Sequence, residues 1–110
     1  MVGRKPREEL LNLELDRIIG KIDMAGVQKI ILFGSLAKGN VNLTSDIDLI
    51  IIRETSQRFL DRLDAVYREI EPNMAVDVLV YTPKEIADMI QWNSFIRQAL
   101  KEGRVLYEAQ

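Results

Sequence analysis

The spacing of apolar residues changes character within the first third of the chain. After Pro6, apolar residues recur every three or four positions, which predicts an amphipathic helix over about residues 6–25, ended by Gly26. The residues that carry this spacing are Leu11, Leu15, Ile18 and Ile22. The run QKIILF that follows is short, largely apolar and rich in β-branched side chains, which is typical of a buried strand.

The same change of spacing repeats to the C-terminus. The pattern predicts further strands in DIDLIII and AVDVLVY, and an edge strand in RVLYE. It also predicts a short helix in SLAKG and a helix over about residues 56–70. Two more helices are expected, one from Thr82 to near Gln91 and one that follows Asn93 or Ser94 and is ended by Gly103. The start at Thr82 is marked by an N-cap threonine, by Pro83 at the first helical position and by Glu85 as capping-box partner. Alternating strands and helices predict an α/β (α+β) fold with a small sheet.

No internal repeat, low-complexity tract or linker interrupts the 110 residues, so we expect a single domain over residues 1–110. The N-terminus lacks the apolar segment of a signal peptide, and no apolar run approaches the length that spans a membrane. A cytoplasmic protein is the resulting expectation.

Charge and composition narrow the possible chemistry. The chain has 15 basic and 17 acidic residues, a net charge of −2, so no overall positive field indicates nucleic-acid binding. The basic cluster of Arg4, Lys5 and Arg7 is interpreted as a solvated chain end. The absence of Cys and His excludes disulfides, Cys/His zinc sites and a histidine general base. A metal site would therefore use oxygen ligands and a hard cation.

Two carboxylates stand at the start of the second predicted strand. Side chains alternate along a strand, so Asp46 and Asp48 lie on one face, with Cα atoms about 6.5–7 Å apart. Two anions held this close repel each other, and a divalent cation between them would relieve the repulsion. The alternative is that both acids simply end an apolar run at a solvent-exposed strand start.

Asp77 and the Gly34-Ser35 break add to this pattern. Asp77 interrupts MAVDVLV, where an ionised side chain is costly unless it is paired, metal-bound or exposed on an edge strand. Three acids borne on strands are the arrangement that a two-metal site uses. Gly34 lets the backbone turn close to a ligand, and Ser35 with the free N–H groups of the next helix would hold a phosphate. The alternative is an ordinary strand-to-helix turn with Ser35 as N-cap.

Gly34-Ser35, ten intervening residues, Asp46-x-Asp48 and a strand-borne Asp77 together resemble the nucleotidyltransferase superfamily that includes DNA polymerase beta. The local forms GSLAKG and SDIDLIII are similar in particular to the minimal nucleotidyltransferases (MNT proteins), which are often paired with HEPN-domain toxins. The resemblance covers nearly the whole chain, including the closing EGRVLYE. It implies the nucleotidyltransferase fold, a mixed β-sheet with helices packed against it.

The resemblance also implies a role for each of these residues. Asp46 and Asp48 would bind the Mg²⁺ that carries the nucleoside triphosphate. Asp77 would complete a second Mg²⁺ position and help to activate the acceptor hydroxyl, while Gly34 and Ser35 hold the terminal phosphates. The chemistry would transfer AMP from ATP and release pyrophosphate, and it needs no histidine because metals lower the pKa of the acceptor.

The expected partner also follows from the resemblance. MNT proteins of the paired systems are antitoxins, so the implied acceptor is a tyrosine of a HEPN toxin. The alternative is a non-catalytic module that binds nucleotide and Mg²⁺ and neutralises its partner by occlusion. A transferase that modifies nucleic acid is disfavoured by the net charge of −2.

Five other residues each have two interpretations. Lys38 either contacts phosphate or faces solvent, and Ser45 either fixes the approach to Asp46 or is an ordinary turn serine. A group of apolar residues near the C-terminus is either core or a surface for docking a partner or a second copy of the chain. This group is Trp92, Phe95 and Ile96.

Overall fold

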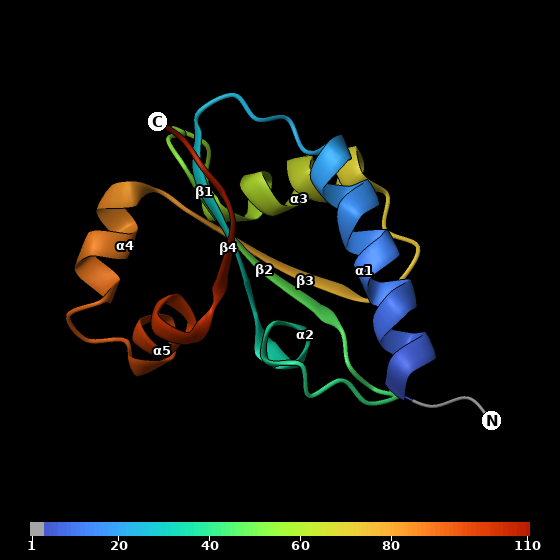
Figure 1. Cartoon of the computed structure of the whole chain (residues 1–110). Helices are drawn as coiled ribbons and strands as arrows, with labels where there is room; N and C mark the ends of the chain where they lie inside the picture. Colours follow the sequence, from blue (N-terminus) through green and yellow to red (C-terminus); the bar gives the residue numbers. More distant parts are fainter. Residues whose placement is uncertain (1–3) are drawn as a thin grey trace.

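Four strands form one mixed sheet in the computed structural model of the chain, which describes residues 4–110 (Figure 1). The strands are β1 (Val27–Phe33), β2 (Ile47–Arg53), β3 (Val76–Tyr81) and β4 (Arg104–Glu108). Their order across the sheet is β3-β2-β1-β4; β2 and β3 are parallel, and the other two pairs are antiparallel. The predicted mixed α/β sheet is confirmed, with RVLYE at its edge.

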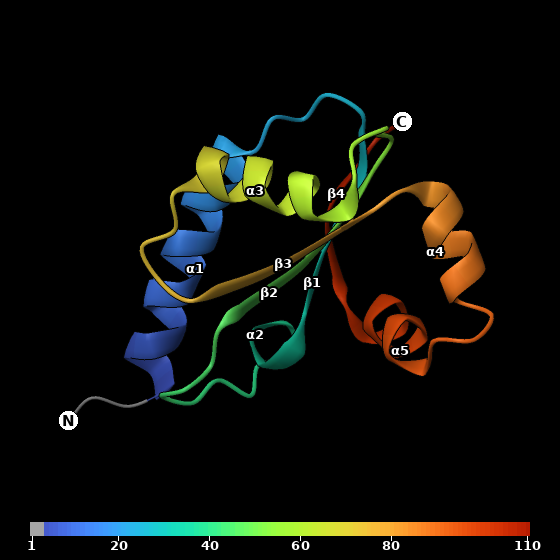
Figure 2. The ribbon, with the colours of Figure 1, turned by 180° about the vertical axis from the view of Figure 1, so that it is seen from behind.

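Five helices of the described chain cover the two faces of this sheet. They are α1 (Arg4–Lys21), α2 (Gly34–Lys38), α3 (Phe59–Ile70), α4 (Pro83–Met89) and α5 (Ser94–Glu102). Figures 1 and 2 show α1 and α3 together on one side of the sheet, with α4 and α5 on the other. Because β2 and β3 are parallel, the chain must cross over between them, and α3 is that crossover.

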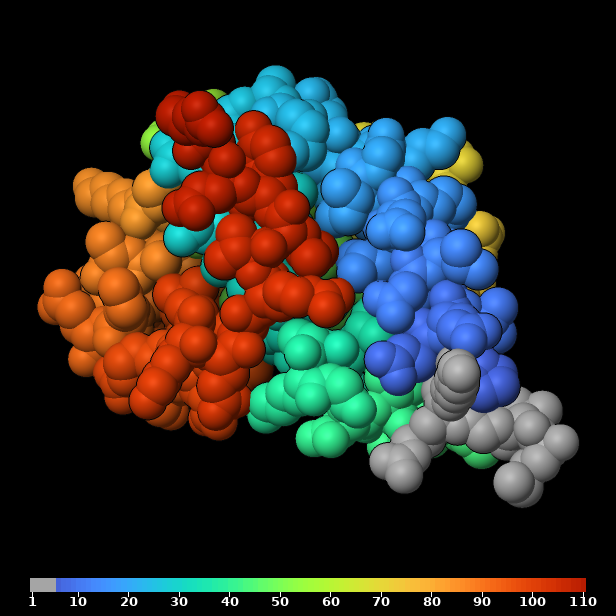
Figure 3. All heavy atoms as spheres, viewed as in Figure 1, coloured from blue at the N-terminus to red at the C-terminus, as the bar shows by residue number. Residues whose placement is uncertain are grey.

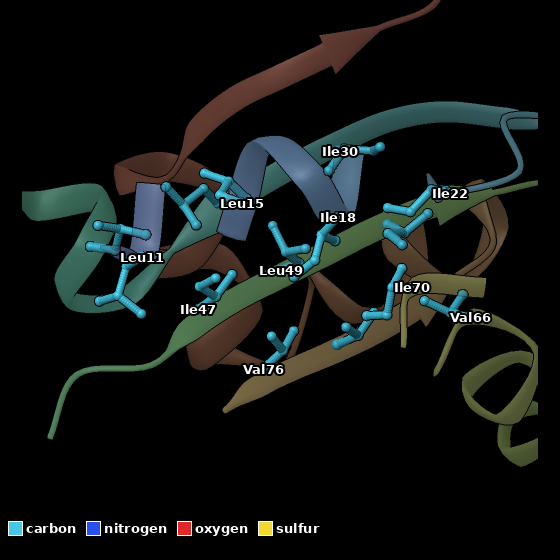
Figure 4. Close-up of a cluster of buried hydrophobic side chains, with 14 of the residues drawn as sticks. Leu11, Leu15, Ile18, Ile22, Ile30, Ile47, Leu49, Val66, Ile70 and Val76 are labelled. Carbon is cyan, nitrogen blue, oxygen red and sulfur yellow. The ribbon is translucent and has the colours of Figure 1, made fainter. Parts of the chain in front are cut away.

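The larger core lies between the sheet and the pair α1 and α3. The helical stripe that the sequence predicted in α1 is fully buried here, and it meets alternate residues of β1, β2 and β3 (Figure 4). Residues of this core include Leu11, Leu15, Ile18, Ile22, Ile30, Ile47, Leu49, Val66, Ile70 and Val76.

The opposite face of the sheet is only partly covered. A smaller cluster packs α4 and α5 against the far half of β2, where Ile50 and Ile52 are buried beneath Ile86 and Ile96. Asp48 points to this same face, two residues before Ile50, but it lies outside the cluster. The start of β2 on this face is therefore left open beside α4 and α5.

Several boundaries differ from those predicted. α1 ends at Lys21 rather than near residue 25, because the chain turns there and Val27 N–H donates to the Met24 carbonyl at 3.1 Å. α3 begins at Phe59 rather than residue 56, and α4 ends at Met89, before Gln91. The capping box is confirmed: Glu85 N–H donates to Thr82 Oγ1 at 3.1 Å, and Thr82 N–H donates to Glu85 Oε1 at 2.7 Å.

The apolar group near the C-terminus divides between core and surface. Ile96 is fully buried, whereas Trp92 is 65% exposed and Phe95 is 50% exposed. The core interpretation is thus confirmed only for Ile96. No helix within residues 4–110 combines the length and the apolar character needed to cross a membrane.

Candidate active site

The parallel pairing of β2 and β3 places two of the predicted acids side by side. Asp48 and Asp77 are register partners across these strands, so their side chains leave the sheet on the same face. Asp46 lies one residue before β2, on the same side of the chain by alternation, and is half-buried like Asp48. Asp77 is exposed, and β3 is an edge strand, so the exposed position that sequence reasoning considered is also observed.

The three acids share one electrostatic environment. The pKa of Asp48 is raised from 3.8 to about 6, first by burial, then by the negative charge of Asp77 and then by that of Asp46. At neutral pH the Asp48 carboxyl group is therefore ionised, although burial and the neighbouring negative charges both disfavour its ionised form. The negative charges of Asp77 and Asp46 thus both act on Asp48.

A divalent cation fits the chemistry of these residues. No group of three or more acidic side chains within residues 4–110 has the arrangement of a complete metal-ligand set. The donors are nevertheless all carboxylate oxygens, which hard cations such as Mg²⁺ prefer. Burial raises the pKa of Asp48 most, and the negative charges of Asp77 and Asp46 add to the shift; a bound cation would offset these two charges.

Gly34 is in direct contact with this acidic group. It follows β1 with φ of +77°, in the left-handed region that favours glycine. A Cβ atom at position 34 would collide with the Asp48 carboxylate, whose Oδ2 would be the nearest atom to it. The sequence break at Gly34 is therefore required by the closeness of the turn to Asp48.

Ser35 and Ser45 connect this turn to the segment that leads to Asp46. Ser35 Oγ donates to Ser45 Oγ at 2.9 Å, and the Asn42 N–H donates to the same Ser45 oxygen at 2.8 Å. Ser45 is 5% exposed, so these bonds are shielded from water. The interpretation of Ser45 as the residue that fixes the approach to Asp46 is supported, and the alternative of Ser35 as N-cap is wrong, because α2 has no side-chain cap.

The N-terminal basic cluster is not simply solvated. Arg7 is half-buried, and its Nη2 donates to the Ser45 carbonyl at 2.9 Å, which ties α1 to the same segment. The prediction of a solvated chain end is therefore wrong for Arg7. For Arg4 and Lys5 it concerns side chains outside the described part of the structure.

A cavity of about 270 Å³ opens beside Gly34. Phe33 and Gly34 line it on one side, and Phe95, Gln98, Ala99 and Glu102 line it from α5. Lys38, at the end of α2, also lines it, and its Nζ lies 3.2 Å from Glu102 Oε2. Sequence reasoning missed Phe33, Gln98 and Glu102, because no local pattern shows that α5 packs next to α2.

Comparisons with known proteins identify relatives of the chain in sequence and in fold. The sequence model of the polymerase beta nucleotidyltransferase family matches residues 16–110. A protein of Methanocaldococcus jannaschii that carries the provisional name protein adenylyltransferase is 35% identical over 107 residues, which cover 97% of this chain and 100% of the relative.

Solved structures share the fold. A Sulfolobus solfataricus protein, provisionally named a nucleotidyltransferase, aligns with a TM-score of 0.57 at 20% identity, over 96% of this chain and 83% of its own. A toxin–antitoxin structure with AMP-PNP has a TM-score of 0.53 at 20% identity, over 90% and 73% of the two chains. A mutant of the MntA-HpeT toxin–antitoxin has a TM-score of 0.52 at 21% identity, over 90% and 72%. By the match of its sequence over residues 16–110 and by its fold, the chain belongs to the polymerase beta nucleotidyltransferase family.

Proposed function

We propose that this nucleotidyltransferase transfers AMP from ATP to a protein hydroxyl, and that it acts as the antitoxin of a HEPN-domain toxin by modifying a tyrosine. The pairing of Asp48 with Asp77 beside Gly34 carries the proposal, because it joins a candidate metal-binding face to a backbone turn without a side chain. The relative with the provisional name protein adenylyltransferase supports a protein acceptor. The toxin–antitoxin structures of the same fold support an antitoxin role.

Each residue of the site has a proposed task. Asp46 and Asp48 hold Mg²⁺ with the triphosphate of ATP, and Asp77 serves a second Mg²⁺. When bound, these ions neutralise phosphate charge and lower the pKa of the acceptor hydroxyl. Gly34 lets the Asp48 carboxylate approach the backbone of the turn, and the Ser35 hydroxyl, which lies within the same turn, would help to hold the terminal phosphates.

The transfer step forms one bond to phosphorus, breaks another and moves one proton. The acceptor oxygen forms a bond to the α-phosphorus of ATP, and the bond from that phosphorus to the bridging oxygen of pyrophosphate breaks. The proton of the acceptor hydroxyl passes to a carboxylate, and Asp77 is the acid of this group that is exposed to an incoming protein. A net charge of −2 is consistent with a protein acceptor rather than a nucleic acid.

Label transfer tests the proposal. The purified protein is incubated with Mg²⁺, a HEPN-domain protein from the neighbouring gene, and ATP labelled on either the α- or the γ-phosphate. AMP transfer labels the toxin from the α-phosphate only, and a Tyr→Phe series in the toxin identifies the acceptor. Absence of α-label on the toxin, or absence of a HEPN gene beside this one, contradicts the proposal.

Matched variants separate catalysis from binding. Asp46→Asn, Asp48→Asn and Asp77→Asn should each lower transfer by about a hundredfold or more. Asp16→Asn, which removes an exposed carboxylate from α1, should leave transfer unchanged. Full neutralisation of the toxin by all three site variants would instead support the non-catalytic module that binds nucleotide and occludes its partner.

A further inference from the structure

The cavity beside Gly34 adjoins the acidic face. Phe33 is the register partner of Asp48, and the next residue, Gly34, is the one that the Asp48 carboxylate approaches most closely. Both Phe33 and Gly34 line the cavity. Gly34 is thus common to the acidic group and to the wall of the cavity, so a nucleotide whose phosphates lie at Asp48 would have this space beside it. Figure 3 shows α2 between α1 and α5 on the visible face of the molecule.

The size and the walls of the cavity favour one flat ring. Its volume of about 270 Å³ lies below the ~300–1,000 Å³ typical of sites for whole drug-sized ligands, so it fits part of a nucleotide. Phe33 and Phe95 meet edge to face at 5.5 Å between ring centroids and 82° between planes. Phe95 is 50% exposed, so its ring offers an apolar surface to a ligand.

Two polar side chains of the cavity, Glu102 and Gln98, can bind the exocyclic amino group of adenine. Glu102 accepts a hydrogen bond from Gln98 Nε2 at 3.3 Å and pairs with Lys38 at 3.2 Å. A carboxylate can accept from the exocyclic amino group of adenine but repels the carbonyl oxygen that guanine has at the same position. The Gln98 amide has two N–H donors and one carbonyl acceptor, and its bond to Glu102 uses one donor. One donor and the acceptor remain for a ligand, which is the combination that glutamine uses on adenine.

We propose that this cavity binds the base of the nucleotide, and that Glu102 and Gln98 select adenine over guanine. This inference rests on the proposed function, since it assumes that the triphosphate lies at Gly34 and Asp48. It assigns binding and specificity to residues of α5, outside the acidic group. Lys38 then links the two parts of the site, because it ends the helix that begins at Gly34 and pairs with Glu102 at 3.2 Å.

The test is calorimetric titration of the purified protein with Mg-ATP, Mg-GTP and Mg-tripolyphosphate. Base–aromatic stacking is worth ~1–3 kcal/mol, so Phe95→Ala should weaken ATP binding about 5- to 150-fold and leave tripolyphosphate binding unchanged. Glu102→Gln should reduce the preference for ATP over GTP about tenfold or more. Glu102 is an exposed residue, so this variant folds even if Phe95→Ala does not.

Trp92→Ala is the matched control, because Trp92 is 65% exposed and lies outside the lining of the cavity. It should leave ATP affinity unchanged. Equal loss of ATP affinity in Trp92→Ala and Phe95→Ala, or ATP and GTP binding equally in the wild type, overturns the inference.

The outcome for the cavity is separable from the outcome for the proposed function. Base-dependent binding that Phe95→Ala weakens, without any AMP transfer, would retain the cavity assignment and reject the proposed transferase activity. Normal ATP binding by Phe95→Ala with loss of transfer would show that the cavity receives the acceptor tyrosine, which overturns the assignment to the base.

Discussion

Gly34 and Asp48 lie so close together that any side chain at position 34 would meet the Asp48 carboxylate. The contact joins the end of β1 to the start of β2, whose residues Phe33 and Asp48 are register partners. The same glycine has φ of +77°, so steric and backbone requirements act at one position. Two features that are separate in the sequence, the glycine turn and the first acids, thus form one surface.

Replacing Gly34 by alanine should remove activity and lower stability. The added Cβ displaces the Asp48 carboxylate, and the positive φ adds about 1 kcal/mol of backbone strain. We expect AMP transfer to fall by about a hundredfold or more and the free energy of unfolding to fall by about 2 kcal/mol. Label transfer and urea denaturation measure the two effects.

Gly39→Ala is the control for backbone strain alone. Gly39 has φ of +76°, but a Cβ atom there meets nothing within 4 Å. This variant should lose about 1 kcal/mol of stability and keep its transfer rate. Equal loss of transfer in both variants would show that the contact with Asp48 is not the cause.

Asp48→Asn should make the protein more stable while it inactivates it. The folded-state pKa of Asp48 is about 6, above the ordinary value of 3.8, so its ionised form opposes folding at pH 7. This cost is fully present above the folded pKa and disappears as the pH falls below about 4. We expect the variant to gain about 1 kcal/mol at pH 7 in EDTA, or about 4–8 °C in Tm.

Added Mg²⁺ provides the complementary measurement for Asp48. It should raise the Tm of the wild type, whose charge it neutralises, and have less effect on the asparagine variant. Asp16→Asn, at an exposed position of α1, should change neither value. A wild type that is as stable as Asp48→Asn at pH 7 in EDTA would refute this cost of ionising Asp48, to which burial contributes first and repulsion by Asp77 and Asp46 second.

Ser45→Ala should loosen the segment that leads to Asp46. The substitution leaves the Asn42 N–H and the Ser35 hydroxyl without the oxygen that accepts from both, in a buried position. We expect a loss of about 1–3 kcal/mol in the free energy of unfolding and a slower transfer reaction. Hydrogen exchange at Asn42 should become faster. Leu43→Ala, at an exposed position of the same segment, should leave the Asn42 amide protected.

Glu14 should determine part of the acid stability. It is 6% exposed; Oε1 accepts from Arg17 Nε at 2.8 Å, and Oε2 accepts from Asn73 N–H at 2.6 Å. The Arg17 bond above all lowers its pKa from 4.5 to about 2, so its stabilisation is complete above pH 4.5 and lost as the pH falls to about 2.

Glu14→Gln isolates this contribution. At pH 7 the variant should be about 2–3 kcal/mol less stable than the wild type, and the difference should shrink between pH 4.5 and 2. Glu9→Gln, an exposed carboxylate on the same helix, is the control. A difference that stays constant from pH 5 to pH 2 would exclude this titration.

The order of elements was predictable because its signals are local. Helical spacing in α1, the apolar runs of the strands and the capping box before α4 each depend on residues within a few positions of one another. Boundaries were less predictable: α1 stops at Lys21, four residues earlier than expected, because the turn before β1 forms its own hydrogen bond. The bond from Glu14 to Asn73 was not predictable in this way, because Asn73 lies far along the chain.

The sequence alone determined that Asp46 and Asp48 share a face and that a glycine precedes the short helix, since alternation and backbone freedom are local properties. Only the tertiary structure decided that Asp77 stands beside Asp48, because strand register depends on how the α1 and α3 layer packs on the sheet. It also decided that α5 forms one wall of a cavity next to Gly34. Such contacts join residues whose separation along the chain carries no periodic signal.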